Sequence, residues 1–212
     1  MVRHWCASEV DKEVLENYQR YLERKTLYKS FGYDVDKERA FIIEKAQPIF
    51  GDILEVGTGK GHFALALAKE GYRFISVDIS KEEQRIAKLN LRYFGLEGSV
   101  DFRIENAENL SFQDKSFDII FAVNALHHFI NPYRVIDELV RLIKSKGKII
   151  LSDFTKEGLE FMDKIHTSEG RKHEVSNTTL ADIERYLIEK SFKIDKASSK
   201  FQEVLVAYHQ LI

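Results

Sequence analysis

The sequence predicts a doubly wound α/β fold: a seven-stranded sheet with five parallel strands and a C-terminal hairpin, preceded by an N-terminal helical extension. Between residues 51 and 153, short apolar runs of strand length alternate with segments whose apolar residues recur at helical spacing. A glycine-rich turn joins the first strand to the next helix, and two short strands close the chain. Such alternation is typical of a parallel sheet with helices on both faces.

Length and charge limit the function classes. The chain has 212 residues, 44% of them hydrophobic and 31% charged, which suits one compact globular unit. Its 32 Lys and Arg residues nearly balance 34 Asp and Glu residues, for a net charge of -2. No global positive field gathers nucleic acid, so we expect no nucleic-acid partner and favour a small-molecule substrate. Nothing in the sequence indicates the oligomeric state.

The cysteine and histidine content argues against disulfide and metal chemistry. Cys6 is the single cysteine, so no intramolecular disulfide forms. His4, Cys6, His166 and His173 follow no ligand spacing, and we expect no metal site. The sequence has no apolar run of membrane-spanning length and no signal-peptide pattern, which predicts a cytoplasmic protein without membrane insertion.

Residues 1–50 are expected to form the helical extension, and residues 51–212 the sheet domain. Charged and apolar residues alternate at helical spacing over 8–30 and 34–47. Phe31-Gly32 breaks the two helices apart, and Pro48 with Gly51 ends the second.

Strands and helices are expected to alternate regularly along the sheet domain. Each predicted strand is an apolar run, and each predicted helix ends near a glycine or a polar break. The predicted strands are 53–56, 74–78, 100–104, 117–123 and 148–151, with helices at 62–70, 81–93 and 133–143. Beyond Asp153 the regularity weakens, and there the sequence predicts a helix at 182–190 and strands at 193–196 and 203–209.

The turn after the first strand carries glycines at alternate positions. Gly57, Gly59 and Gly61 leave backbone without side chains, which lets a ligand approach closely. The dinucleotide fingerprint would need a further glycine where His62 stands, and the phosphate-binding Gly-Lys-Ser/Thr is missing. The glycines indicate a nucleotide-like ligand without separating the cofactor classes.

Glu55 narrows the choice of ligand. A carboxylate facing this loop would repel a pyrophosphate at close range and would suit a cationic ligand better. S-adenosylmethionine carries a sulfonium and an ammonium group and has no phosphate. The alternative is that Glu55 merely contacts solvent or a lysine at the strand end.

Asp78 ends the second strand, 21 residues after Gly57. In such folds an acid at this place reaches the ribose hydroxyls of a bound nucleoside. The alternative role, an N-terminal cap for the next helix, suits Ser80 better.

Five segments in order resemble the motifs of class I S-adenosylmethionine-dependent methyltransferases, and are most similar to the quinone-biosynthesis type of small-molecule enzyme. They are residues 54–63, 77–80, 105–112, 117–129 and 147–151. The resemblance covers about residues 52–153. It implies a Rossmann-like fold and S-adenosylmethionine as cofactor.

The resemblance also implies roles for individual residues. Those around the methionine part of the cofactor would be Glu55, Gly57, Thr58, Gly59 and Gly61. Asp78, with Ile79 beside it, would hold the ribose. Asn106 and Ala107, followed by Glu108, occupy the adenine-facing position, where the family usually has Asp-Ala; the Asn amide oxygen can still accept a hydrogen bond from adenine. Asn124 would face the methionine end and the substrate.

Two histidines are candidates for proton transfer. Methyl transfer from a sulfonium is an in-line displacement that alignment alone can accelerate, so a base is optional. If the acceptor must lose a proton, His127 or His128 is placed to take it. The alternative is that one packs against the following helix while the other is solvated. Asp153 either contacts a ligand or caps the next helix.

The segments most variable in this fold are expected to shape the acceptor pocket. They are the N-terminal extension, which in relatives forms a lid over the cofactor, and the irregular stretch with Lys164, His166, Arg171, Lys172 and His173. The sequence therefore predicts a methyltransferase acting in line on a small molecule. Two alternatives stay open: a non-catalytic or regulatory S-adenosylmethionine-binding protein, and a nicotinamide-dependent oxidoreductase that rests on the shared fold alone. Whether O, N, C or S accepts the methyl group is not readable.

Overall fold

A computed structural model describes residues 11–168 and 178–209. The helices are α1 (Lys12–Ser30), α2 (Val35–Lys45), α3 (His62–Lys69), α4 (Lys81–Tyr93), α5 (Pro132–Leu142), α6 (Lys156–Ser168) and α7 (Leu180–Glu189), with short 3-10 turns η1 (Glu97–Ser99) and η2 (Leu126–His128). The strands are β1 (Ile53–Val56), β2 (Phe74–Asp78), β3 (Val100–Ile104), β4 (Phe117–Val123), β5 (Ile143–Phe154), β6 (Phe192–Ser198) and β7 (Gln202–His209).

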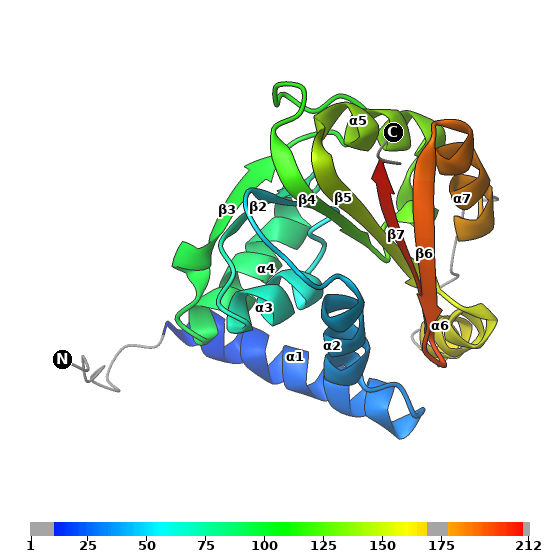
Figure 1. The fold of residues 1–212 in the computed structure, drawn as a ribbon. Coiled ribbons are helices and arrows are strands. Elements are labelled where there is room, and N and C mark those ends of the chain that lie inside the picture. Colours follow the sequence, from blue (N-terminus) through cyan, green and yellow to red (C-terminus); the bar gives the residue numbers. More distant parts are fainter. Residues whose placement is uncertain (1–10, 169–177, 210–212) are drawn as a thin grey trace.

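The strands form one seven-stranded sheet in the order β3-β2-β1-β4-β5-β7-β6 (Figure 1). The first five strands of the chain run parallel, and β7 runs antiparallel to both β5 and β6. This confirms the predicted doubly wound sheet with a C-terminal hairpin. The strand order reverses between β1 and β4, and in such sheets ligands bind beyond the carboxyl ends of the strands at that point.

Both faces of the sheet are buried, which explains the nearly continuous apolar strands. Along β4, Phe121 belongs to one apolar cluster and its neighbours Ile120 and Ala122 to the other. Side chains of α5 and α7 complete the cluster with Ile120, and those of α2 and α3 complete the cluster with Phe121. The helical layers on the two sides hold the carboxyl ends of the strands in fixed register.

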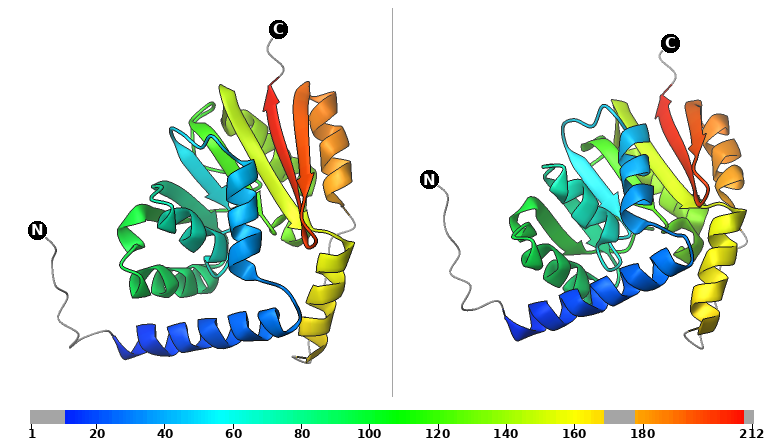
Figure 2. Two further views of the ribbon diagram at one scale, coloured as in Figure 1. Left: turned by 60° about the horizontal axis from the view of Figure 1, so that its bottom comes forward. Right: turned by 90° about the horizontal axis from the view of Figure 1, so that it is seen from below.

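Helix α1 lies across the lower end of the molecule in Figure 1, and the view from below shows it running from α4 toward α6 (Figure 2). Tyr18 of α1 stacks on Tyr93 of α4, with ring centroids 3.5 Å apart. A third, smaller apolar cluster forms where the end of α1 meets α6 and the β6–β7 turn, around Tyr33, Phe161 and Phe201. The α1 region is therefore packed against α4 at one place and against α6 and the β6–β7 turn at another.

Strand β5 is three times as long as the predicted strand at 148–151. It begins at Ile143, which pairs with Phe117 of β4 across an irregularity in the register. Gly147 lies inside the strand at a position with no room for a side chain. A Cβ there would come within 2.6 Å of the Asp118 carbonyl oxygen. The glycine that suggested a strand start marks a close approach of two strands.

The prediction of an irregular stretch after Asp153 is wrong for residues 156–168, which form α6. Phe161 and Ile165, four residues apart, are buried hydrophobic side chains that hold this helix in place. Two members of the predicted polar cluster, Lys164 and His166, lie on α6; the others, Arg171, Lys172 and His173, lie outside the described residues. The remaining predicted strands and helices agree with the structure within a few residues at their ends.

Substitution of Gly61 by alanine is expected to destabilise the fold by about 2 kcal/mol or more. Gly61 has φ +75°, and a Cβ would lie 2.7 Å from the Ala87 Cβ and 3.0 Å from the Ala87 Cα of α4. Gly98→Ala is the matched control, since its Cβ would meet nothing within 4 Å. Urea unfolding of both variants measures the difference, and equal losses would contradict the packing argument.

Candidate functional site

Backbone hydrogen bonds to β2 fix the loop after β1. The N–H groups of Gly57 and Thr58 donate to the Val77 carbonyl at 2.9 and 3.2 Å. Gly57 has φ +89°, and a Cβ there would lie 2.6 Å from the Ala125 Cβ, so this loop touches the loop after β4. At Gly59 a Cβ would meet nothing within 4 Å. The loop thus presents bare backbone at the point where the strand order reverses.

Glu55 lies in the middle of the sheet and is only 1% exposed. Its register partners are Ser76 of β2 and Phe121 of β4. The Ser76 hydroxyl donates to Glu55 Oε2 at 2.5 Å. Burial raises the pKa of the Glu55 carboxyl to about 8, although Ser76 and the Arg39 guanidinium act in the opposite direction. The alternative of a solvent-exposed Glu55 is wrong; a buried carboxyl of this kind gains most from a cation brought next to it.

Asp78 links the glycine loop to the start of α4. Its Oδ2 accepts from the Gly59 N–H at 2.7 Å, and its Oδ1 accepts from the Ser80 N–H at 2.8 Å. The predicted cap is confirmed, because the Ser80 hydroxyl accepts from the Glu83 N–H at 3.2 Å. A carboxylate has about four acceptor positions, so two remain for ribose hydroxyls. Ile79 beside it is 71% exposed and offers an apolar surface.

The loop after β3 is tied to the loop after β4. Asn106 Oδ1 accepts from the Glu108 N–H at 3.0 Å. The Glu108 carboxylate accepts from the backbone and side-chain amides of Asn131, at 3.1 and 3.0 Å. Ala107 between them packs against the apolar cluster of the sheet. Sequence reasoning placed all three at the adenine; the structure in addition gives Glu108 a contact that fixes the two loops together.

Asn124 is the centre of a buried polar network. Its φ is +52°, and its N–H donates to the Ser152 carbonyl at 2.8 Å. With the amide oriented to satisfy its neighbours, Asn124 Oδ1 accepts from both terminal nitrogens of Arg39 at 3.0 Å, and its nitrogen donates to Gln202 Oε1 at 2.7 Å. Gln202 also accepts from the Ser152 hydroxyl at 2.9 Å and donates to the Tyr33 hydroxyl at 3.2 Å. The network joins α2, β4, β5 and the C-terminal hairpin.

Arg39 is a site residue that sequence reasoning missed. It is 8% exposed, and its Nε is buried without a hydrogen-bond partner among the described residues. The pKa of His62 is lowered to about 3, first by burial and then by its cationic neighbours Arg39, Arg24, Lys60 and Lys25. His62 is therefore neutral at physiological pH. A buried guanidinium with a spare donor is suited to an anionic oxygen. The missed signal is an arginine on the face of α2 that otherwise buries Val35 and Ile42.

The two candidate histidines differ in their surroundings. His127 is buried, and its Nδ1 lies 2.8 and 3.0 Å from the two carboxylate oxygens of Asp153. His128 is exposed, with its ring centroid 4.1 Å from that of His127. Asp153 does not cap α6: in the first turn of that helix the Thr155 hydroxyl accepts from the Gly158 N–H at 3.1 Å. The structure therefore pairs His127 with Asp153 and leaves His128 at the surface.

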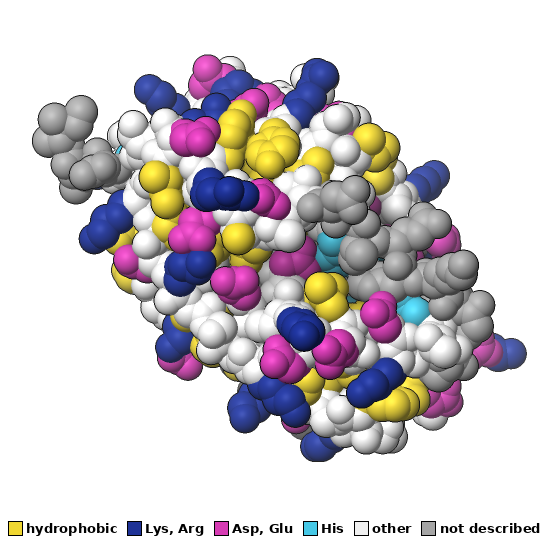
Figure 3. All heavy atoms as spheres, turned by 90° about the vertical axis from the view of Figure 1, so that its right-hand side faces the viewer, with side chains coloured by type: hydrophobic (Ala, Val, Ile, Leu, Met, Phe, Trp, Pro, Cys, Tyr) yellow, Lys and Arg dark blue, Asp and Glu magenta, His cyan; other side chains and the backbone are white. Residues whose placement is uncertain are grey.

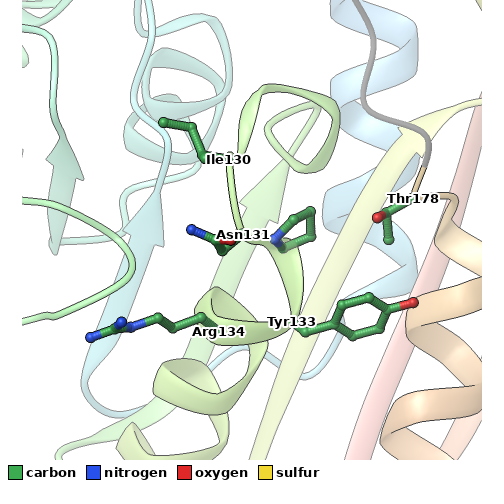
Figure 4. Close-up of a pocket in the computed structure, with 6 residues that line it drawn as sticks. Ile130, Asn131, Tyr133, Arg134 and Thr178 are labelled. Atoms are coloured by element: carbon green, nitrogen blue, oxygen red, sulfur yellow. The ribbon is translucent and has the colours of Figure 1, made fainter.

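A separate hollow of about 480 Å³ lies at the start of α5. Its lining residues are Ile130, Asn131, Pro132, Tyr133, Arg134 and Thr178. Figure 4 shows Tyr133 and Thr178 on one side of it, with Ile130 and Arg134 projecting the other way. Two of the lining residues, Asn131 and Arg134, donate hydrogen bonds to Glu108. The hollow therefore borders the loops described above, and its lining does not include Glu55 or Asp78.

The structure also bears on the surface charge, on possible metal ligands and on membrane-spanning helices. On the face that carries α6 and α7, Lys and Arg are interspersed with Asp and Glu (Figure 3). In the part of the chain that the structure describes, no three His, Cys, Asp or Glu side chains gather as a metal site, and no helix has the length and apolarity to cross a membrane. Three residues of the discarded metal set, His4, Cys6 and His173, lie outside that part.

Comparison with known sequences identifies the central region. Residues 54–151 match the family model described as a methyltransferase domain. An uncharacterized methyltransferase of Bacillus subtilis, YcgJ, is 38% identical over 101 residues, which cover 48% of this chain and 40% of that protein. A ubiquinone biosynthesis O-methyltransferase of Xylella fastidiosa is 31% identical over 122 residues, covering 57% and 49% respectively. The matches thus span at most half the length of these curated relatives.

Solved structures extend the similarity of fold to most of the chain. The crystal structure of YcgJ aligns with a TM-score of 0.63 at 20% identity, over 81% of this chain and 98% of that one. Magnesium protoporphyrin IX methyltransferase of Synechocystis, solved with bound S-adenosylhomocysteine, aligns with a TM-score of 0.62 at 17% identity, over 94% and 96%. At these identities the structures establish the shared fold.

Replacement of Glu55 by glutamine is expected to remove a pH-dependent loss of stability. Between about pH 4.5 and 8 the folded carboxyl keeps a proton that the unfolded chain has lost, so wild-type stability falls as pH rises through this window. Glutamine mimics the protonated form. The stability of Glu55→Gln relative to wild type should rise by up to about 1.4 kcal/mol per pH unit.

Urea unfolding at pH 5 and pH 8 measures this difference. Glu70→Gln, a change at an exposed position, is the control. A difference between Glu55→Gln and wild type that does not change with pH would show that the Glu55 carboxyl is already ionised in the folded protein.

Proposed function

We propose that this chain, whose residues 54–151 match the model of a methyltransferase domain, is an S-adenosylmethionine-dependent methyltransferase that transfers a methyl group in line to a small-molecule acceptor. The observation that carries the proposal is a buried acidic group and a buried basic group at the point where the strand order reverses. Glu55 is a buried carboxyl raised in pKa, and Arg39 is a buried guanidinium with an unpaired Nε. These two groups suit a ligand that carries both a positive and a negative group.

The residues present fit S-adenosylmethionine at this place. The Glu55 carboxylate would lie toward the ammonium and sulfonium groups, and the Arg39 guanidinium would hold the carboxylate of the methionine part. Gly57, Thr58, Gly59 and Gly61 would line the same end with backbone. When bound, the cofactor supplies a methyl carbon that is already activated for displacement.

The nucleoside half would be held by the loops after β2 and β3. Asp78 would accept hydrogen bonds from both ribose hydroxyls while keeping its contacts to the Gly59 and Ser80 amides. Ile79 and Ala107 would lie against the adenine faces, and the Asn106 amide oxygen would accept from its exocyclic amine. Glu108, through Asn131, would hold this loop beside the loop after β4.

The acceptor would lie beside Asn124, between the end of β4 and the aromatic cluster of Tyr33, Phe161 and Phe201. Catalysis would then consist mainly of alignment, because the packed helices α1, α2 and α6 restrict how a small molecule can approach. The O-methyltransferase name of one relative favours an oxygen acceptor. A protein or nucleic-acid acceptor is not favoured by the mixed charges of the surface in Figure 3.

The transfer itself is tested by incubation with S-adenosylmethionine and a panel of hydroxylated, amino and thiol-bearing small molecules. We expect binding in calorimetry and release of S-adenosylhomocysteine with at least one acceptor. Binding without release across the panel would support the alternative of a regulatory S-adenosylmethionine-binding protein. Binding of NAD in place of S-adenosylmethionine would refute the proposal.

Arg39→Met is expected to weaken binding of S-adenosylhomocysteine by about 10- to 100-fold, the cost of losing a charged hydrogen bond. Binding of 5′-methylthioadenosine, which has the same nucleoside but no amino-acid part, should change little. Arg20→Met, an exposed arginine of α1, is the matched control. Calorimetry of both ligands decides the role, since equal losses for the two would place the effect of Arg39 in the fold and not at the carboxylate.

A further inference from the structure

The Lys60–Gly61 peptide lies in the second half of the glycine loop, beyond the two backbone hydrogen bonds to Val77. Gly61 has φ +75°, and glycine adopts positive and negative φ about equally readily, so this peptide can turn over unless both of its ends are held. The Gly61 N–H donates to the Thr58 carbonyl at 2.9 Å inside the loop. Selection of one orientation requires a second hydrogen bond, at the Lys60 carbonyl.

A buried side chain of α4 supplies that hydrogen bond. Asn90 is 3% exposed, and its Nδ2 donates to the Lys60 carbonyl at 2.8 Å. A carbonyl oxygen only accepts hydrogen bonds, so the amide nitrogen of Asn90 must face the loop. If the Asn90 amide turned by 180°, two oxygen atoms would face each other in a buried place and the hydrogen bond would be lost. The orientation of this amide therefore decides the orientation of the loop peptide.

Helix α1 fixes the orientation of the Asn90 amide. Asn17 is 4% exposed, and its Nδ2 donates to Asn90 Oδ1 at 2.7 Å. It lies between Val14 and Tyr21 on the buried face of α1, where an apolar side chain would pack without needing a partner. A buried amide pair is costly unless it is hydrogen bonded, and once bonded it favours one arrangement of the helices that carry it. The two hydrogen bonds run in one direction, from α1 through α4 to the loop.

Aromatic contacts hold α1 in place on both sides of Asn17. Tyr18 stacks on Tyr93 of α4, with ring centroids 3.5 Å apart. Tyr21 stacks on His62, the residue after Gly61, with ring centroids 5.5 Å apart. Figure 2 shows α1 lying along the lower side of the molecule beside α4. Helix α1 thus reaches the glycine loop at two points, through the Asn90 amide and through the His62 ring.

We propose that Asn17 and Asn90 are positioning residues for S-adenosylmethionine. The hydrogen bonds from Asn17 to Asn90 and from Asn90 to the Lys60 carbonyl, here called the amide relay, keep the glycine loop in its cofactor-binding orientation. This inference rests on the proposed function, in which the loop lines the methionine part of the cofactor. Neither side chain would touch the cofactor, because the amide relay acts through the backbone of the loop.

The amide relay couples cofactor binding to the docking of α1. Such coupling is reciprocal: if docked α1 raises the affinity for the cofactor, bound cofactor stabilises docked α1 by the same factor. Saturation of the wild-type protein with S-adenosylhomocysteine should therefore slow amide hydrogen exchange in α1 more than in α7, which packs on the other face of the sheet. In Asn90→Leu this extra protection of α1 should be lost. Equal protection of the two helices in the wild-type protein would overturn the proposal.

Binding of S-adenosylhomocysteine, measured by calorimetry, tests the order of the amide relay. Asn90→Leu should raise Kd by about 10-fold and Asn17→Leu by about 5-fold, the range expected for the loss of one hydrogen bond. The double variant should bind as weakly as Asn90→Leu alone, because Asn17 acts only through Asn90. Gln19→Leu, the loss of an exposed amide on α1, is the matched control. An unchanged Kd in either single variant, or losses that multiply in the double variant, would overturn the proposal.

Asn90→Asp keeps the shape of the side chain and changes its polarity. An ionised carboxylate at this position cannot donate to the Lys60 carbonyl, whereas a protonated one donates to it and still accepts from Asn17. Burial raises the pKa of such a carboxyl, so it takes up a proton as the pH falls. The Kd of Asn90→Asp relative to wild type should therefore fall from about 10-fold at pH 8 to within about 2-fold at pH 5. The ratio to wild type removes the effect of Glu55, which both proteins share.

The control for this change is Gln113→Glu, which converts an exposed amide to an acid and should bind like wild type at both pH values. Circular dichroism establishes that each variant is folded under the conditions of the titration. A merely structural role would lower the unfolding midpoint of Asn90→Asp and leave the Kd of the folded protein unchanged, which would overturn the amide relay. A Kd ratio equal at pH 5 and pH 8 would do the same. A wild-type protein that binds neither S-adenosylmethionine nor S-adenosylhomocysteine would instead count against the proposed function.

Discussion

The site depends on a carboxyl group buried at the centre of the sheet. Glu55 stands where β1 is flanked by β2 and β4, and it is buried. A buried ionisable group of this kind is costly unless something in the fold or a ligand compensates it. Ser76 supplies one hydrogen bond from the neighbouring strand, and the positive charge of Arg39 favours the ionised carboxyl. The position of Arg39 in turn requires α2 to pack against the sheet.

This requirement makes the N-terminal extension a structural part of the site. Helix α2 contributes Ile42 and Ile43 to the apolar cluster on one face of the sheet and carries Arg39 on the same side. Glu38, the preceding residue, accepts a hydrogen bond from the Ser199 hydroxyl in the β6–β7 turn. The extension is thus fixed from both the first and the last strands of the chain. These contacts fit an extension that is a fixed part of the candidate site better than one that opens as a lid.

The half of the site that could be predicted from the sequence is the half built from local segments. Gly57, Gly59 and Asp78 stand at the ends of β1 and β2, where spacing along the chain fixes their neighbourhood once the strands are recognised. Arg39 and Gln202 could not be found this way, because 163 positions separate them and only the packing of α2 on β7 brings them to Asn124. For the same reason, the sequence places Asp153 at the end of a strand but does not show that His127 is its partner. The length of β5 was missed because Gly147, a break in most strands, serves here to let β4 approach.

Asn124 connects the two halves, and its backbone explains why an asparagine is suited to the position. A φ of +52° is strained for most side chains, but asparagine tolerates it better than other non-glycine residues. Glycine would relieve the strain and lose the amide that joins Arg39 to Gln202. The strain persists because the Ser152 carbonyl, Arg39 and Gln202 together determine one conformation. The turn that follows carries His127 back toward Asp153, so the same short segment holds both the Arg39 guanidinium and the His127–Asp153 pair.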